Sequence, residues 1–249
     1  MKLGIIGGTG ALGLFESGPG TAVTTPFGAP SARPRRVEIE GRGCWFLARH
    51  GEPHRIPPHR VNYRANIQAL KNLGVDSILA INAVGGLSPA FEAGALVAPD
   101  QLIDLTWGRS HTFSDGGSAP LRHIDFTAPF DGPLRARVLA AATDAGCALH
   151  DGAVHVVTQG PRLETAAEVR WLSAMGGELV GMTAMPEAAL AREAGLDYAS
   201  ICAVANAGAG LSEGPITEQA IAEVLERAML EVGQVIRALL RTLPPGDEA

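Results

Sequence analysis

Four short polar segments of the sequence contain residue types that bind anions. The glycine-rich segment GIIGGTGALG, residues 4–13, holds Thr9 between two glycines. Arg49-His50 follows the apolar run WFLA, Asn82-Ala83 ends another apolar run, and Thr183 follows LVGM. Backbone N–H groups, hydroxyls and a guanidinium all donate hydrogen bonds to phosphate oxygens. We therefore predict a phosphate site, and its members are Thr9, Arg49, His50, Asn82, Ala83 and Thr183.

The same glycine segment also matches G-x-G-x-x-G, the pattern of dinucleotide-binding folds. Those folds need a helix directly after the third glycine and an acidic residue about 20 residues further on, at the end of a strand. The following segment LFESGPGTAVTTPFGAP leaves room for barely one helical turn, and Glu38 and Glu40 lie within a strand pattern. Close approach of the backbone to an anion is therefore favoured over NAD binding, and a plain tight turn is the structural alternative.

Alternating strand and helix patterns place the polar segments at strand ends. Apolar runs predict strands at 3–6, 77–87, 96–106, 153–160, 178–183 and 198–210, with two short strands over 37–48. Apolar periodicity predicts helices at 61–73, 134–146, 164–176, 186–195 and 217–243, and loops at 17–36, 51–59 and 107–128. This order is typical of one three-layer α/β domain over residues 1–249, in which about 244–249 form a frayed tail. Ligands of such sheets sit at the carboxyl ends of the strands.

Composition limits the partners and the compartment of the chain. The net charge of −6 comes without a basic block, so no nucleic-acid partner is expected. No apolar run approaches the roughly 20 residues that a membrane span needs, and the N-terminus reads as mature structure rather than a signal peptide. Three scattered cysteines without C-x-x-C spacing predict reduced thiols and a cytoplasmic protein. His50, His54 and His59 lie in a proline-rich segment without a cysteine or carboxylate cluster, so no metal is expected.

Longer motifs resemble the family of trimeric purine nucleoside phosphorylases and methylthioadenosine phosphorylases. In chain order they are IIGGTG, TPFGAPS, LARHG, VNYRANIQALK, NAVGG, QGPRLETAAEV, VGMTAMPEA and LAREAGLDYASI, and the similarity runs from about residue 3 to 240. The resemblance implies a three-layer phosphorylase/hydrolase-like fold with a mixed central sheet, and a homotrimer. It also implies phosphorolysis of a small-molecule nucleoside, with inorganic phosphate as co-substrate and no cofactor.

The resemblance assigns roles to single residues around the sugar. The predicted phosphate residues match the family's phosphate contacts, and Ala83 acts through its backbone N–H. Met182 matches the residue under the ribose, and His123 matches the position where a neighbouring subunit closes the 5′ end. Phosphate is already an anionic nucleophile, so the protein mainly positions it below C1′ and stabilises charge on the leaving purine.

The resemblance also indicates the base. Glu164 in GPRLET matches the position that is Glu in enzymes for 6-oxopurines and Ser in methylthioadenosine phosphorylases. Its carboxylate would accept the N1–H of hypoxanthine, whereas adenine has a bare N1 lone pair. Asn206 in AVANAG matches the Asn that donates to N7, and Ala207 and Gly208 follow it in the substrate site. A mismatched polar group in such a site discriminates strongly.

Ile221 matches the position that faces the 5′ substituent, where ordinary purine nucleoside phosphorylases carry His. An Ile would bury a methylthio group and could not bond a hydroxyl. The combined pattern implies S-methyl-5′-thioinosine as substrate. A general inosine/guanosine phosphorylase, a methylthioadenosine phosphorylase, a nucleosidase and a non-catalytic nucleoside- or phosphate-binding protein remain alternatives. By residue type alone, Glu164 could stabilise the start of a helix through the helix dipole, and Thr183 could cap the helix that follows it. Met182 and Ile221 could be ordinary core residues.

Overall fold

A computed structural model describes residues 1–15, 18–39, 41–116 and 121–243. The strands are β1 (Leu3–Gly7), β2 (Arg35–Ile39), β3 (Arg42–Ala48), β4 (Ser77–Gly86), β5 (Leu96–Ala98), β6 (Gln101–Asp104), β7 (Leu149–Asp151), β8 (Val154–Val157), β9 (Leu179–Gly181) and β10 (Asp197–Ala207). The helices are α1 (Tyr63–Asn72), α2 (Pro133–Asp144), α3 (Ala166–Ala174), α4 (Ala184–Glu193) and α5 (Glu218–Thr242), with 3-10 turns η1 (Ala11–Leu14) and η2 (Pro58–Arg60). The tail expected at about 244–249 lies outside the described residues.

The described strands form one mixed sheet, as predicted. Its main path runs β2-β3-β1-β4-β10-β5-β7, and a branch of β6, β8 and β9 joins β4 through β9. Strands β3, β1, β4 and β10 are mutually parallel, whereas β2, β5 and β9 pair antiparallel with β3, β10 and β4. Because the four central strands are parallel, their carboxyl ends meet at one edge of the sheet.

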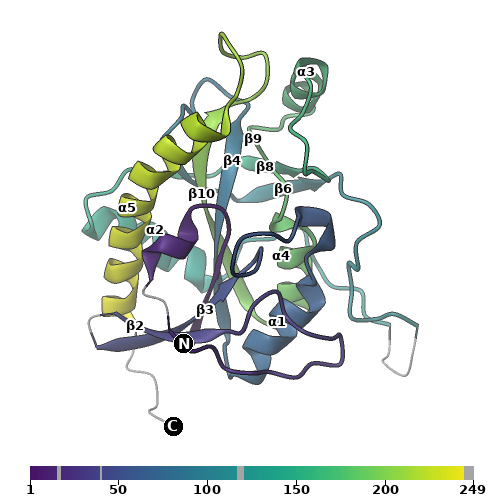
Figure 1. Cartoon of the computed structure of the whole chain (residues 1–249), viewed down its shortest axis with the longest axis vertical. Helices are drawn as coiled ribbons and strands as arrows, with labels where there is room; N and C mark the ends of the chain where they lie inside the picture. Colours follow the sequence, from purple (N-terminus) through teal and green to yellow (C-terminus); the bar gives the residue numbers. More distant parts are fainter. Residues whose placement is uncertain (16–17, 40, 117–120, 244–249) are drawn as a thin grey trace.

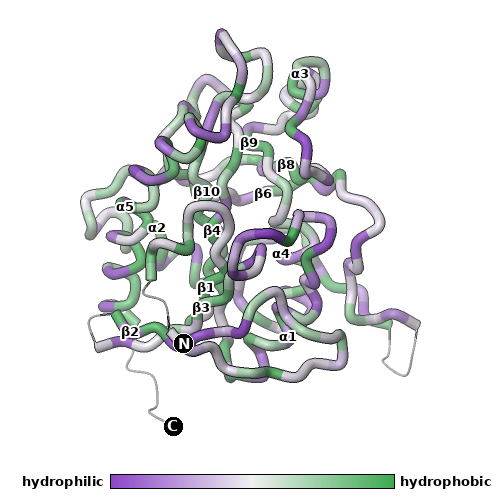
Figure 2. Tube along the Cα trace, viewed as in Figure 1, coloured by the Kyte–Doolittle hydropathy of each residue, from purple (hydrophilic) through white to green (hydrophobic). Residues whose placement is uncertain are grey.

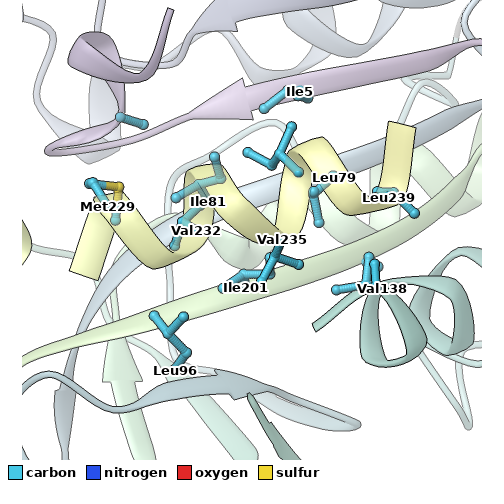
Figure 3. Close-up of a cluster of buried hydrophobic side chains, with 14 of the residues drawn as sticks. Ile5, Leu79, Ile81, Leu96, Val138, Ile201, Met229, Val232, Val235 and Leu239 are labelled. Atoms are coloured by element: carbon cyan, nitrogen blue, oxygen red, sulfur yellow. The ribbon is translucent and has the colours of Figure 1, made fainter. Parts of the chain in front are cut away.

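Helices cover both faces of the sheet, which confirms the three-layer prediction. Helices α5 and α2 pack on one face, and α1 and α4 lie on the other (Figure 1). On the α5 side, Val232 and Val235 belong to the same buried cluster as Leu79 and Ile201 of the sheet (Figure 3). The tube in Figure 2 is strongly hydrophobic along the central strands and hydrophilic over many of the connecting loops. The apolar packing on the two faces of the sheet fixes the position of its carboxyl edge. The segments that contain Thr9, Arg49, Ala83 and Thr183 lie at this edge.

Three local predictions differ from the structure. The strand expected over 96–106 is two strands, β5 and β6, which are separated at Pro99-Asp100. A proline has no N–H for the sheet ladder, and the chain leaves β10 there to pair with β8 instead. Strand β7 was not predicted, and the turn η2 begins within the proline-rich segment that was assigned to a loop. The expectation of barely one helical turn after the glycine segment is confirmed by η1, Ala11–Leu14.

Candidate active site

A cavity of about 740 Å³ opens at the carboxyl edge of the central strands. It brings together segments that are far apart in the sequence, including the loops after β1 and β3 and the start of α5. Most of the predicted site residues line it, namely Thr9, Arg49, His50, Ala83, Glu164, Met182, Thr183, Asn206, Gly208 and Ile221. Asn82, Ala207 and His123 are not part of this lining. The structure therefore gathers most of the residues predicted to bind phosphate, the base and the 5′ group in one cavity.

The glycine segment allows a close approach between the backbone and Arg49. A Cβ atom on Gly8 would lie 2.6 Å from Nη1 of Arg49 and 3.0 Å from the Ile81 carbonyl oxygen. The Gly8 N–H already donates to that carbonyl at 3.1 Å. Any side chain at this position would displace the guanidinium. Gly8 therefore makes room for the Arg49 guanidinium beside the cavity. The single turn η1 after the glycine segment differs from the helix of a dinucleotide fold.

Arg49 is fully buried and pairs with the equally buried Glu187 of α4. Its Nε and Nη2 donate to the two carboxylate oxygens at 2.7 and 2.8 Å, and Nη1 donates to the Ile81 carbonyl at 3.0 Å. Tyr198 donates its hydroxyl to Glu187 at 3.0 Å. Burial by itself lowers the pKa of Arg49, but the charge and hydrogen bonds of Glu187 outweigh burial and raise it overall. The arginine is permanently charged, and its charge is matched by a neighbouring carboxylate.

Glu187 is a residue that the sequence reasoning missed. It lies in the motif VGMTAMPEA. A glutamate is common at the start of a helix, so its residue type alone does not indicate a role in the site. The available signal was a carboxylate in the otherwise apolar segment AMPEAAL, because a charged side chain on a buried helix face requires a partner. The partner itself lies 138 positions away in sequence, so only the fold identifies it.

His50 is neutral in this site. Burial, the charge of Arg49 and the neighbouring His54 lower the pKa of His50 to about 4. Its Nδ1 lies 2.7 Å from the Ile56 carbonyl oxygen, so Nδ1 carries the proton and Nε2 is left as an acceptor. Its ring stacks on that of His54 with 4.5 Å between the centroids. The His50 side chain can therefore accept a hydrogen bond from a protonated phosphate oxygen, and it brings no positive charge.

Asn82 lies behind Thr183 instead of lining the cavity. Asn82 is 2% exposed, its Oδ1 accepts from the Thr183 hydroxyl at 3.0 Å, and its Nδ2 donates to Ser200 at 2.7 Å. Both ends of the Asn82 amide are therefore used by protein hydroxyls, whereas Ala83, Val84 and Gly85, which follow it in β4, line the cavity. The phosphate role predicted for Asn82 thus becomes a contact with Thr183.

Thr183 does not cap the helix that follows it. It occupies the N-cap position of α4, but its hydroxyl oxygen accepts no capping hydrogen bond from the helix backbone. The hydroxyl donates to Oδ1 of Asn82 instead. Thr183 therefore does not act as the helix cap that its residue type allowed. Its hydroxyl oxygen keeps lone pairs that can accept a hydrogen bond from a ligand hydroxyl.

Two polar side chains line the far part of the cavity. Glu164 is half-buried, and its Oε1 accepts from the Thr158 hydroxyl at 2.6 Å. The start of α3 is instead capped by Thr165 and Glu168, which form a capping box, so Glu164 is not needed for that purpose. Asn206 follows an irregularity in the pairing of β10 with β4, and one N–H of its amide donates to the Ala207 carbonyl at 2.7 Å. The second N–H of the amide is available to a ligand.

Apolar residues line the part of the cavity at the start of α5. Ile221 is half-buried, and it both packs against the core cluster on the α5 side and lines the cavity. Ile216 and Ala222 extend this apolar wall, and Ile56 and Pro57 line the cavity as well. Arg55 and Glu218 are exposed charged residues in the lining that sequence reasoning did not select. His123 is exposed and lies outside the cavity of its own chain.

Among the described residues, no group of three or more His, Cys, Asp or Glu is arranged to hold a metal ion. Within the same residues, no helix has the length and apolar character needed to cross a membrane.

Comparison with known proteins places the chain among nucleoside phosphorylases. The model of the phosphorylase superfamily matches residues 2–241. A probable S-methyl-5′-thioinosine phosphorylase of Pseudomonas syringae pv. tomato is 48% identical over 96% of this chain and 97% of that protein. A 6-oxopurine nucleoside phosphorylase of Pyrococcus furiosus is 39% identical over 98% of this chain and 93% of that protein.

A solved structure has the same fold. The methylthioadenosine phosphorylase of Schistosoma mansoni in complex with adenine superposes with a TM-score of 0.90 at 35% identity. The match covers 96% of this chain and 91% of that one. With the family model matched over nearly the full length and relatives similar end to end, the chain belongs to the phosphorylase superfamily.

Proposed function

We propose that the protein catalyses phosphorolysis of S-methyl-5′-thioinosine to hypoxanthine and 5-methylthioribose 1-phosphate. The observation that carries this proposal is a single cavity that combines three kinds of lining. It holds an arginine and a threonine for phosphate, Glu164 and Asn206 for a purine, and Ile221 for an apolar 5′ group. The Pseudomonas syringae relative named for this activity supports the same choice.

The chemistry requires positioning more than acid–base catalysis. A phosphate oxygen forms a bond to C1′ while the bond from C1′ to N9 of the purine breaks, and the electron pair leaves with the base. Arg49 and Thr9 hold the phosphate, and Met182 lies under the ribose. The charge on the leaving purine is reduced when the free N–H of Asn206 donates to N7. Such preorganised contacts lower the barrier because they need no rearrangement in the transition state.

Glu164 and Ile221 select the substrate from opposite ends. The free carboxylate oxygen of Glu164 accepts the N1–H of a 6-oxopurine, whereas N1 of adenine presents a lone pair and is repelled. Ile221 stabilises a methylthio group by burying it, and it leaves a 5′-hydroxyl without a partner. Burying one such apolar group contributes about 1–3 kcal/mol, which corresponds to about 10- to 200-fold in selectivity.

Initial rates on three nucleosides test the proposal. S-methyl-5′-thioinosine, inosine and methylthioadenosine are each assayed with and without phosphate. We expect a strict phosphate requirement and a preference for methylthioinosine of about 100-fold or more. Turnover without phosphate would indicate a nucleosidase, and binding without turnover would indicate a non-catalytic protein.

The same assay separates the two rival phosphorylases. Equal rates with inosine would make the protein a general 6-oxopurine nucleoside phosphorylase, the activity named for the Pyrococcus furiosus relative. Preference for methylthioadenosine, the substrate named for the Schistosoma mansoni enzyme, would contradict the role of Glu164 and Asn206.

We further propose that the enzyme works as a cytoplasmic homotrimer without a cofactor. The three free cysteines support a reducing compartment. His123, exposed and outside its own cavity, is proposed to close the 5′ end of a neighbouring subunit's site. Sedimentation analysis should give a trimer, and His123→Ala should raise KM for the nucleoside without changing the mass of the assembly. A monomer with full activity would contradict this proposal.

A further inference from the structure

Thr158 contacts the purine-selecting carboxylate from outside the cavity. It lies directly after β8, and its hydroxyl donates to Oε1 of Glu164 at 2.6 Å. Thr158 is half-buried and is not part of the cavity lining. A threonine hydroxyl has only one hydrogen. The Gly181 carbonyl is a second acceptor at 3.4 Å, so the carboxylate at 2.6 Å is the nearer and stronger partner. The hydrogen bond leaves Oε2 of Glu164 as the oxygen that a purine can use.

The backbone around Thr158 is fixed on two sides. Its own N–H donates to the Gly181 carbonyl of β9 at 2.8 Å. From the other side, Arg109 donates through Nη2 to the carbonyls of Thr158 and Gln159 at 3.3 and 2.9 Å. With its backbone held in this way, Thr158 can move its hydroxyl only by rotation about χ1, so the hydroxyl can define the direction of the Glu164 side chain.

We propose that Thr158 is a positioning residue for base selectivity. Its hydroxyl holds the Glu164 carboxylate in the orientation that receives the N1–H of a 6-oxopurine. This inference rests on the proposed function, in which Glu164 recognises the base. A glutamate side chain loses considerable rotational freedom when it binds a ligand. A partner that fixes it beforehand removes that cost from binding.

The experiment measures the binding of free bases as well as turnover. Thr158→Val removes the hydroxyl at nearly constant volume, and Thr158→Ser restores a donor on a smaller side chain. Without this hydroxyl, hypoxanthine must order the Glu164 side chain when it binds, which is expected to weaken its binding about tenfold in the presence of phosphate. The Kd of adenine should stay unchanged. KM for methylthioinosine should rise by a similar factor with a smaller change in kcat, and Thr158→Ser should recover most of the loss.

A double-mutant cycle separates positioning from a general structural effect. Thr158→Val is repeated in a Glu164→Gln background, and we expect it to have little further effect on hypoxanthine binding there. An equal tenfold loss in that background, or equal losses for hypoxanthine and adenine, would overturn the proposal. If Thr158→Val does not fold, Thr158→Ala carries the same expectations.

The two proposals fail in different ways. Glu164→Gln without any effect on the ratio of hypoxanthine to adenine binding would contradict the base-recognition role of Glu164, and with it this inference. A large effect of Glu164→Gln combined with no effect of Thr158→Val would overturn the role of Thr158 alone.

Discussion

At the residue scale, the phosphate end of the site depends on a charge that is already paired. The guanidinium of Arg49 forms two hydrogen bonds to Glu187, and both side chains are fully buried. The Arg49–Glu187 pair carries no net charge. We therefore expect Arg49 to contribute mainly a hydrogen-bond donor of fixed direction to phosphate binding, and little net electrostatic attraction. Among the described residues, Arg55 is the other arginine in the cavity lining, and it is exposed.

Removal of Glu187 should destabilise the protein strongly. Glu187→Ala leaves Arg49 buried without its partner, which is expected to cost about 3–5 kcal/mol in the free energy of unfolding. Urea denaturation measures this value. The double variant Arg49→Met/Glu187→Met should recover most of the stability, because apolar replacement of a buried pair is often neutral. The KM of this double variant for phosphate should still be higher than that of the wild type, because the double variant lacks Arg49. A double variant no more stable than Glu187→Ala would contradict this account.

Ile221 should control the 5′ preference. Ile221→Asn replaces an apolar wall with a side chain that can bond a 5′-hydroxyl. The ratio of kcat/KM for methylthioinosine to that for inosine should fall by about tenfold or more. Leu230→Asn on the same helix is the matched control, since Leu230 is 68% exposed and not part of the lining. An unchanged ratio in Ile221→Asn would show that the 5′ group binds elsewhere.

At the element scale, Arg109 connects the segments that carry Glu164 and Met182, the residues proposed to contact the base and the ribose. Besides the carbonyls of Thr158 and Gln159, its Nη1 donates to the carbonyls of Met182 and Met185 at 2.8 and 2.6 Å. These acceptors belong to the segment after β8, to the link between β9 and α4, and to the first turn of α4. One planar guanidinium therefore sets the spacing between two loops that approach the cavity from different strands.

Substitution of Arg109 should affect all nucleosides alike. Arg109→Lys keeps the charge but has three donors on one nitrogen, which cannot reach acceptors on both segments. We expect kcat/KM for methylthioinosine and methylthioadenosine to fall together, by about tenfold. Steady-state kinetics on both substrates measure this change, and the exposed Arg122→Lys is the control. A loss confined to one base would assign Arg109 to base recognition instead.

At the scale of the whole molecule, buried neutral histidines make stability depend on pH. Burial and the charge of Arg49 lower the pKa of His155 to about 4, and the pKa of His50 is similarly low. In the unfolded chain both should titrate near the ordinary value of about 6.5. Below that pH the unfolded state binds more protons than the folded state. Stability is therefore complete above about pH 6.5 and falls as the pH approaches 4.

The expected loss of stability can be measured at about pH 5.0, where most carboxylates are still charged. Between pH 7.5 and 5.0, each of these histidines should lower the free energy of unfolding by about 2 kcal/mol. Urea denaturation at both pH values should show about half of the wild-type difference in His155→Gln. The exposed His59→Gln should keep the full difference. An identical pH dependence in wild type and His155→Gln would refute this assignment.

The sequence by itself determined the architecture and most of the site membership. Apolar periodicity gave the main strands and helices, and polar residues after apolar runs gave the carboxyl edge, because parallel strands bring their ends together. Thr9, Arg49, Thr183 and Asn206 were found in this way or through family motifs, and all line one cavity. These signals are local, so one-dimensional patterns are sufficient to reveal them.

Only the tertiary structure decided which side chains support that cavity. Glu187 pairs with Arg49 across 138 positions, and Arg109 spans about 50 positions to Gln159 and 73 to Met182. Asn82 lies behind Thr183, and its amide is hydrogen-bonded to the hydroxyls of Thr183 and Ser200. Such partners have no fixed spacing along the chain. They are selected because a buried charge or hydroxyl must find a partner in space, and the packing of the layers decides which one is within reach.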